Sequence, residues 1–548
     1  MRRLLVLTLL VPAFAVAQPR YVATNATVYT VDDAHPVAEA FAVEDGRFVA
    51  VGTEAEVVAG RADWPRRDLG GQTVVPGLID AHAHLMGLGE SLLSADLVGT
   101  ISKADILDRL RAFEATLPEG AWLTGRGWDQ NDWGGDGAFP TRQDLDAAFP
   151  DRPVWLSRID GHADWANSAA LRAAGLDPEA PAPGDPEGGA IVRDDQGRPT
   201  GVFVDGASAL VGAAVPEPDR AFVEAALTRA LEETARAGLT GVHDAGAPLV
   251  AVDLYRQFAA AGRFPLRVYA MITPGEIGRF CDTHPDGIDE PRVVVHGVKL
   301  YADGALGSRG AALLADYSDD HGNQGLLFQT PEALRATVQA AMVCGLQVNT
   351  HAIGDRANRE VLDVYEAAIA HTGGGPGRHR IEHAQILSLD DLARFAALGI
   401  IASVQPTHAT SDMPWAGDRL GADRLKGAYA WRRLVDSGAR LALGSDFPVE
   451  RVSPLLGFYA AVTRQDAENE PAGGWYGNQS LTRAEALKGF TLDAAFAGFM
   501  EDEVGSIEPG KRADFVVLSQ DLMTVPPEEL LATRVLATYL DGEAVYEE

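Results

Sequence analysis

The sequence predicts an α/β fold, a (β/α)8 TIM barrel with a small β-sandwich domain built from both chain ends and a large insertion after the first barrel strand. Three observations support this fold class. Eight short apolar segments alternate with helical patterns through the middle of the 548-residue chain, as parallel βα units do. Short β runs separated by turns occupy both ends. A stretch at about residues 86–235, far longer than a βα loop, separates the first apolar segment from the second.

The eight apolar segments are the candidates for the barrel strands. Each has the length of a strand and is bounded by turns or helical patterns. The candidates are residues 73–82, 239–244, 266–272, 293–301, 346–351, 380–383, 400–405 and 440–446. Helical runs such as residues 220–237 and 356–370 lie between them. Eight strands of this kind fit a (β/α)8 barrel.

Turn residues predict β-hairpins at both ends of the chain. Glu44-Asp45-Gly46 separates two β runs near the N-terminus, and Asp541-Gly542 separates two more near the C-terminus. We expect the two ends to meet in one small β domain. The predicted domains are a signal peptide at 1–17, a first β part at 18–75, the barrel at 76–500 with its insertion at about 86–235, and a second β part at 501–548.

The first residues have the pattern of a signal peptide. Arg2 and Arg3 precede an apolar stretch that is too short to span a membrane, and the small residues Ala15 and Ala17 fit a cleavage site. We therefore expect an exported protein, periplasmic or extracellular, with an uncleaved anchor as the alternative. In an oxidising compartment Cys281 and Cys344 could pair, and a buried free thiol at Cys344 is the alternative.

The charge of the chain limits its partners. Acidic residues outnumber basic residues by 78 to 46, which gives a formal net charge of −32. Such a chain repels nucleic acid and anionic membranes. We expect a small-molecule substrate, no nucleic-acid partner and no membrane association after signal cleavage, and the sequence leaves a homodimer open.

Metal-ligand residue types stand at the ends of predicted strands. His82 and His84 end the first strand, His351 the fifth, His383 the sixth and Asp446 the eighth. The carboxyl ends of barrel strands converge on one point, where active sites form. Residues i and i+2 of a strand share a face, so His82 and His84 can hold one divalent cation. Asp446 is the expected general base, because a metal lowers the pKa of its bound water towards ~7.

Lys299, on the fourth predicted strand, is unusual at a metal site. A metal repels an ammonium group. Carbamylation by CO2 would turn the side chain into an anionic oxygen ligand that can bridge two metals about 3.5–4 Å apart. The alternative is an unmodified lysine paired with Asp303 or with a substrate carboxylate.

Two segments resemble signatures of the amidohydrolase superfamily. Residues 75–84 (VPGLIDAHAH) are similar to its opening signature, and residues 505–517 (GSIEPGKRADFVV) are similar to its closing signature. Further segments resemble amidohydrolase family 3, which includes metal-dependent hydrolases similar to N-substituted formamide deformylase. These segments are residues 127–130 (GWDQ), 160–163 (DGHA), 299–310 (KLYADGALGSRG), 350–355 (THAIGD) and 381–385 (IEHAQ).

The resemblance implies a metal site with two ions. By that resemblance His82, His84, Lys299 and Asp446 hold one ion, while Lys299, His351 and His383 hold the other. Zinc is the default metal for a histidine-rich site with oxygen ligands, and manganese or iron is the alternative.

Further residues are candidates for the substrate pocket. His162, in the insertion, is expected to be catalytic by hydrogen-bonding the substrate or an oxyanion, and its alternative role is to fix the loop. Trp128 and Asp129 are expected to line the pocket, and Arg309 to hold a substrate carboxylate. Two more histidines lie at or after strand ends: His243, which could face the site or pack structurally, and His408, which we expect at the rim.

The expected activity is hydrolysis of an amide-type C–N bond, in the N-acyl or N-formyl amine class, by a metal-activated hydroxide. Ester, lactone or cyclic-amide hydrolysis on the same site is the alternative. A non-catalytic binding protein is a further alternative, but such a protein would usually have lost a ligand or the base, and this chain keeps them all.

Overall fold

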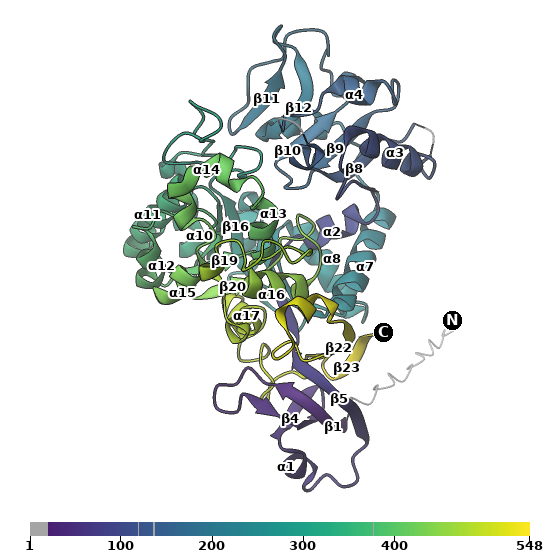
Figure 1. Cartoon of the computed structure of the whole chain (residues 1–548), viewed down its shortest axis with the longest axis vertical. Helices are drawn as coiled ribbons and strands as arrows, with labels where there is room; N and C mark the ends of the chain where they lie inside the picture. Colours follow the sequence, from purple (N-terminus) through teal and green to yellow (C-terminus); the bar gives the residue numbers. More distant parts are fainter. Residues whose placement is uncertain (1–19, 119, 135–136, 376) are drawn as a thin grey trace, which may run out of the picture.

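The computed structural model describes residues 20–118, 120–134, 137–375 and 377–548. The predicted signal peptide, residues 1–17, lies outside this range. Figure 1 shows three stacked parts: a sheet from both chain ends at the bottom, the barrel in the middle and the insertion at the top.

Both chain ends contribute strands to one eight-stranded sheet. Its strands are β1 (Arg20–Tyr29), β2 (Val37–Ala38), β3 (Ala40–Glu44), β4 (Arg47–Gly52), β5 (Arg66–Pro76), β21 (Phe515–Leu518), β22 (Val535–Leu540) and β23 (Glu543–Glu547). The ends meet where β21 pairs antiparallel with β5. The two expected hairpin turns are present, with Asp45 and Asp541 at positive φ of 51°. Phe41, Phe48 and Phe515 pack on one face of the sheet.

The barrel consists of eight parallel strands in one sheet. In sheet order they are β6 (Leu78–Ala83), β13 (Leu239–Ala247), β14 (Arg267–Ile272), β16 (Val293–Tyr301), β17 (Gln347–Ala352), β18 (Arg380–His383), β19 (Ile401–Val404) and β20 (Leu441–Leu443). The two edges of the sheet approach each other: Asp446 N donates to His82 O at 2.7 Å, and His84 N donates to Phe447 O at 2.8 Å. The predicted (β/α)8 fold is therefore confirmed.

The first predicted strand, residues 73–82, is wrong in one respect, because the structure divides it between two sheets. β5 ends at Pro76 in the terminal sheet, and β6 begins at Leu78 in the barrel. Gly77 lies between them, where the chain passes very close to Thr240: a Cβ atom on Gly77 would lie 2.1 Å from Thr240 Oγ1. The apolar run is continuous because both halves are buried.

Helices surround the barrel and join its strands. They are α2 (Leu85–Ser91), α7 (Arg220–Arg236), α8 (Leu249–Ala260), α9 (Ile277–Thr283), α10 (Pro331–Val343), α11 (Asp355–Thr372), α12 (Leu392–Leu398), α13 (Pro406–Asp412), α14 (Ala416–Arg424), α15 (Trp431–Asp436), α16 (Pro454–Thr463), α17 (Arg483–Gly489) and α18 (Leu492–Ala497). The apolar faces of all these helices except α18 join one large core with the strands. Helix α18 belongs to a separate cluster with Ile79 and Met271 of the barrel strands. Among the described residues, no helix combines the length and the apolarity needed to cross a membrane.

The insertion has its own six-stranded sheet. Its elements are β7 (Ala95–Asp96), α3 (Lys103–Glu114), β8 (Leu123–Trp128), α4 (Arg142–Asp146), β9 (Val154–Arg158), β10 (Ala163–Ala166), α5 (Ser168–Ala173), β11 (Gly189–Arg193) and β12 (Pro199–Asp205). Leu123, Trp128, Leu156 and Trp165 form its core. This sheet lies above the barrel (Figure 1). Helices α2 and α7, near the two ends of the predicted range, pack on the barrel instead.

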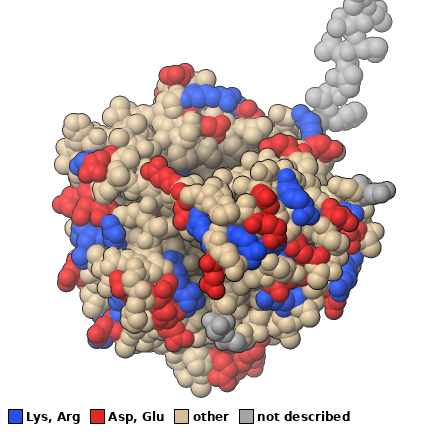
Figure 2. Space-filling view, turned by 90° about the horizontal axis from the view of Figure 1, so that it is seen from above, with Lys and Arg blue, Asp and Glu red and all other residues tan. Residues whose placement is uncertain are grey.

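Figure 2 shows the molecule from the insertion side. On this face acidic side chains are interspersed with basic ones, and the basic residues do not form a continuous patch. The mixture reflects the excess of acidic over basic residues in the chain.

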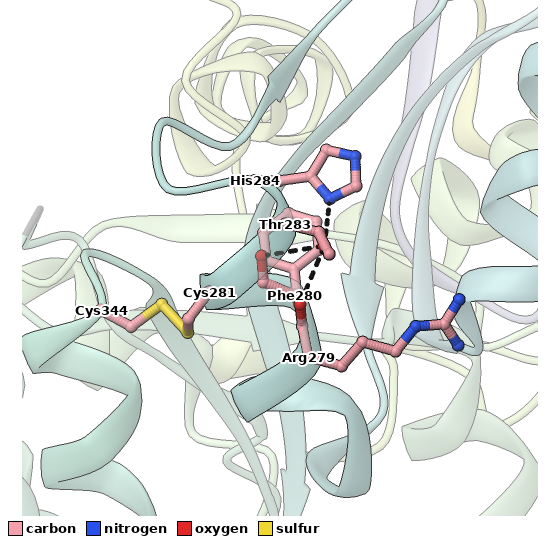
Figure 3. The surroundings of a disulfide bond; sticks show 6 residues. All are labelled: Arg279, Phe280, Cys281, Thr283, His284 and Cys344. Atoms are coloured by element: carbon pink, nitrogen blue, oxygen red, sulfur yellow. Dashed lines mark hydrogen bonds between the residues drawn. A yellow bond between two sulfur atoms is a disulfide. The ribbon is translucent and has the colours of Figure 1, made fainter.

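The two cysteines form a disulfide between neighbouring barrel helices. Cys281 lies on α9, and Cys344 directly follows α10, with Cα atoms 5.9 Å apart (Figure 3). The sequence left this pairing open. The structure decides it, because the packing of α9 and α10 brings together residues that are 63 positions apart.

Candidate metal centre

The strand ends bring the predicted metal ligands together at one end of the barrel. They line a single cavity of about 1020 Å³, together with residues of the insertion. The ligand candidates at this cavity are His84, Lys299, His351, His383 and Asp446. His82 lies directly beneath, fully buried, with Nε2 3.5 Å from Asp446 Oδ1.

One group of donors contains His82, His84 and Asp446. Their donor atoms lie within 4.8 Å of one another, and His84 Nε2 is 3.0 Å from Asp446 Oδ1. Lys299 Nζ lies 3.1 Å from His82 Nε2. Two strand-end imidazoles and one carboxylate therefore converge on one point, as a divalent metal requires.

A second group contains His383, His408 and again Asp446. The rings of His383 and His408 are stacked, and His408 Nε2 is 3.7 Å from Asp446 Oδ2. The ring of His351 lies 4.5 Å from that of His383. The expectation that His408 lies at the rim is wrong. His408 is buried on α13, just after β19, and the strand-end rule that identified the other histidines would have found it.

Buried residues behind the histidines orient them. Glu382 Oε2 lies 2.5 Å from His82 Nδ1, and its other oxygen pairs with the Arg380 guanidinium at 2.7 Å. Gln405 Oε1 lies 2.8 Å from His383 Nδ1. With Nδ1 engaged, the Nε2 atom of each ring faces the centre, which is how proteins set the orientation of metal-bound histidines. Sequence reasoning missed these roles, although Glu382 directly precedes His383.

Asp446 is held as an ionised carboxylate. Burial by itself would raise its pKa, but electrostatic interactions with the rings of His82 and His84 lower the pKa well below its usual range. The loop that carries Asp446 is anchored by Asp80, which accepts hydrogen bonds from the backbone and hydroxyl of Ser445. Asp446 itself has a φ of 63°, in the left-handed region that few non-glycine residues adopt.

The donor set fits a divalent metal. His351 Nε2 and His408 Nε2 are buried and have no hydrogen-bond partner among the described residues. Burial lowers the pKa of His82 to about 4 and holds the pKa values of His351 and His383 well below the usual range. These imidazoles are therefore neutral, which is the form that binds metal.

Lys299 is almost completely buried between the two groups. Burial lowers the pKa of its amine to about 8, so part of the lysine is uncharged at neutral pH. The alternative partner, Asp303, is occupied elsewhere: it accepts hydrogen bonds from the backbone N–H groups of Ala312, Ile353 and Gly354. Among the described residues, Lys299 and Asp303 do not form an ion pair.

Two of the predicted pocket residues face the cavity. Asp129 lines it and pairs with Arg158 at 2.5 Å. His162 also lines it, with its ring centroid 5.3 Å from that of His351. Burial would lower the pKa of His162, but the hydrogen bond and the charge of Asp205 raise it to about 9. The insertion therefore delivers a hydrogen-bond donor to the metal centre.

The pocket roles expected for Trp128 and Arg309 are wrong. Trp128 is fully buried in the core of the insertion, where its Nε1 donates to Leu156 O. A break in strand register and a φ of 109° at Gly127 turn Trp128 away from the cavity that Arg126 lines.

Arg309 does not line the cavity, because its guanidinium pairs with Asp319 at 3.1 Å. His243, whose role the sequence left open, is fully buried, and its Nδ1 accepts a hydrogen bond from Arg380. It packs beneath the ligands as a structural residue.

Comparison with known proteins identifies the family of the chain. Residues 67–546 match the amidohydrolase family. The Bacillus subtilis protein YtcJ is 37% identical over 95% of this chain and 98% of its own length. The N-substituted formamide deformylase of Arthrobacter pascens is 32% identical over 95% of this chain and 97% of its own length. The crystal structure of an uncharacterized metal-dependent hydrolase from Pyrococcus horikoshii is similar with a TM-score of 0.76 and 28% identity, covering 93% of this chain and 99% of that one. With its barrel, its strand-end histidines and this match, the chain belongs to the amidohydrolase family of metal-dependent hydrolases.

Proposed function

We propose that the protein hydrolyses an amide-type C–N bond of the N-acyl or N-formyl amine class. The observation that carries this proposal is Asp446, an ionised carboxylate shared by two groups of imidazoles at the floor of a large cavity. The relative named N-substituted formamide deformylase supports the choice of C–N bond. Ester, lactone or cyclic-amide hydrolysis is the second candidate, because the same residues could act on those carbonyl groups.

The metal content that we propose is two zinc ions. His82, His84, Lys299 and Asp446 would hold one, and Lys299, His351 and His383 would hold the other, with His408 beside it. When bound, such ions supply Lewis acidity that lowers the pKa of water and polarises a carbonyl group. We also propose that Lys299 is carbamylated, since its uncharged amine can react with CO2 and the resulting anion suits the space between the two groups.

The residues of the chain move the proton. Asp446 accepts a proton from the attacking water and returns it to the nitrogen of the leaving amine. Arg380 and Glu382 keep His82 in one orientation throughout. Because the ligands are mostly buried, these groups act with little competition from bulk solvent.

The proposed compartment is the periplasm or the extracellular space. The signal-peptide pattern of residues 1–17 supports export. The disulfide between Cys281 and Cys344 supports it independently, because disulfides persist mainly in oxidising compartments.

The function is tested by removing the metal and the base separately. Chelator-stripped protein should lose hydrolysis of N-formyl and N-acetyl amines and regain it with Zn²⁺. Asp446→Asn should lose activity, whereas the control Asp423→Asn, at an exposed residue paired with Lys426, should keep it. Normal turnover by the metal-free protein would contradict the proposal. Turnover of esters or lactones alone would select the second candidate, and bound metal without any turnover would indicate a binding protein.

A further inference from the structure

Asp205 is one of the residues through which the insertion reaches into the barrel. This residue ends β12, and its carboxylate enters a slot in the loop that follows β16. A Cβ atom on Gly304 would lie 2.9 Å from Asp205 Oδ2, and one on Gly310 would lie 3.0 Å from the same oxygen. The two glycines, which belong to the family-like segment at residues 299–310, therefore leave the space that this carboxylate occupies.

Asp205 in turn holds His162. Its Oδ1 lies 2.7 Å from His162 Nδ1, and its backbone N–H donates to His162 O at 3.0 Å. The backbone N–H of His162 donates to Asp160 Oδ1 at 3.0 Å. These contacts fix the ring and engage Nδ1, so that Nε2 is the nitrogen left to face the cavity beside His351.

The backbone geometry of Asp205 indicates a special position. Its φ of 50° and ψ of −125° are rare for a non-glycine residue. Its second oxygen, Oδ2, is buried without a hydrogen-bond partner among the described residues. Both features oppose folding, and such features persist mainly at functional sites.

We propose that His162 donates a hydrogen bond from Nε2 to the carbonyl oxygen of the substrate as that oxygen gains negative charge, and that Asp205 is the positioning residue that holds this donor through the Gly304–Gly310 slot. This inference rests on the proposed function. It means that the insertion and the barrel form the active site together, because the donor is in place only when the insertion is docked on the barrel. Donors aimed at a developing oxyanion stabilise the transition state more than the bound substrate.

The first test is a double-mutant cycle. His162→Ala should lower kcat about 10²–10³-fold with little change in KM, the range for loss of one oxyanion donor. His162→Gln should restore part of kcat, because its amide N–H can donate a hydrogen bond without help from Asp205. Asp205→Asn should lower kcat in the wild-type background and have no further effect in the His162→Gln background, because a positioning residue acts only through its partner.

The slot is tested by adding a methyl group. Gly310→Ala should displace the Asp205 carboxylate and reproduce the kcat loss of Asp205→Asn with an unchanged metal content. The control is Gly184→Ala in the insertion, where no atom lies within 4 Å of the added Cβ. Normal kcat in Gly310→Ala would count against the slot.

A spectroscopic measurement separates this inference from the proposed function. In protein labelled with ¹⁵N-histidine, the Nδ1–H proton of His162 should resonate far downfield and should disappear from that region in Asp205→Asn. Two results overturn the inference: an unchanged resonance in Asp205→Asn, or an equal loss of kcat from that substitution in both backgrounds. Wild-type protein that hydrolyses no acyl substrate would refute the proposed function, and with it the role of His162, while the Asp205-dependent resonance would still establish the positioning contact.

Discussion

Glu382→Gln separates the structural role of the metal centre from its chemistry. Glu382 is fully buried and contacts both His82 Nδ1, at 2.5 Å, and the buried Arg380 guanidinium, at 2.7 Å. The substitution keeps the size and shape of the side chain but leaves Arg380 without an ion-pair partner among the described residues. Removing one partner of a buried ion pair costs about 3–5 kcal/mol of unfolding free energy. Loss of the carboxylate behind a metal-binding histidine lowers metal affinity about 10–100-fold, or about 1.4–2.7 kcal/mol.

Two assays measure these effects. Denaturant unfolding of the metal-free protein gives the stability change, and competition with a chromophoric chelator gives the metal affinity. Glu501→Gln is the matched control, because Glu501 pairs with Arg378 at 2.7 Å in a partly exposed position. Pairs of that kind contribute about 0–1 kcal/mol. The reasoning fails if Glu382→Gln is as stable as this control and binds zinc with wild-type affinity.

Three further substitutions test separate parts of the molecule. Lys299→Ala should lose activity and regain part of it with formate or acetate, which replace the carbamate oxygens, while Lys426→Ala at the surface needs no such rescue; absence of rescue would argue against a carbamylated lysine. Burial raises the pKa of Glu450 from 4.5 to about 7, so ionisation of its carboxyl destabilises the fold as the pH rises through that window. Glu450→Gln should therefore gain unfolding free energy relative to wild type between about pH 5 and about pH 8, and an equal difference at both pH values would contradict the pKa. Trp128→Ala should lower the unfolding free energy of the insertion by about 3–5 kcal/mol and speed hydrogen exchange in β8–β10, with the zinc content unchanged. A loss of zinc would instead place Trp128 at the metal centre.

The sequence predicted the features that depend on local pattern. Barrel strands are apolar on both faces because helices cover one side and packed side chains fill the other, so each strand stands out as a short apolar run. The carboxyl end of every such strand points to the same place. For that reason the sequence alone groups His82, His351, His383 and Asp446, although they are scattered over most of the chain.

Prediction failed where the direction of a side chain depends on backbone detail. Trp128 and Asp129 are neighbours, yet one lies in a core and the other at the cavity, because the backbone is irregular at Gly127. The same limit applies to the run at residues 73–82, whose apolar pattern is continuous across two different sheets.

By itself, then, the sequence determined the fold class and the residue types at the strand ends. Hydrophobic periodicity and the order of the strands along the chain can be recognised segment by segment, without knowing how distant segments pack. Only the tertiary structure decided the contacts between distant segments. It placed His408 beside His383, Glu382 behind His82, and Asp205 of the insertion in a slot of the barrel. Such contacts depend on how two elements pack in three dimensions, and the sequence pattern of one element does not identify the residue that it will contact in the other.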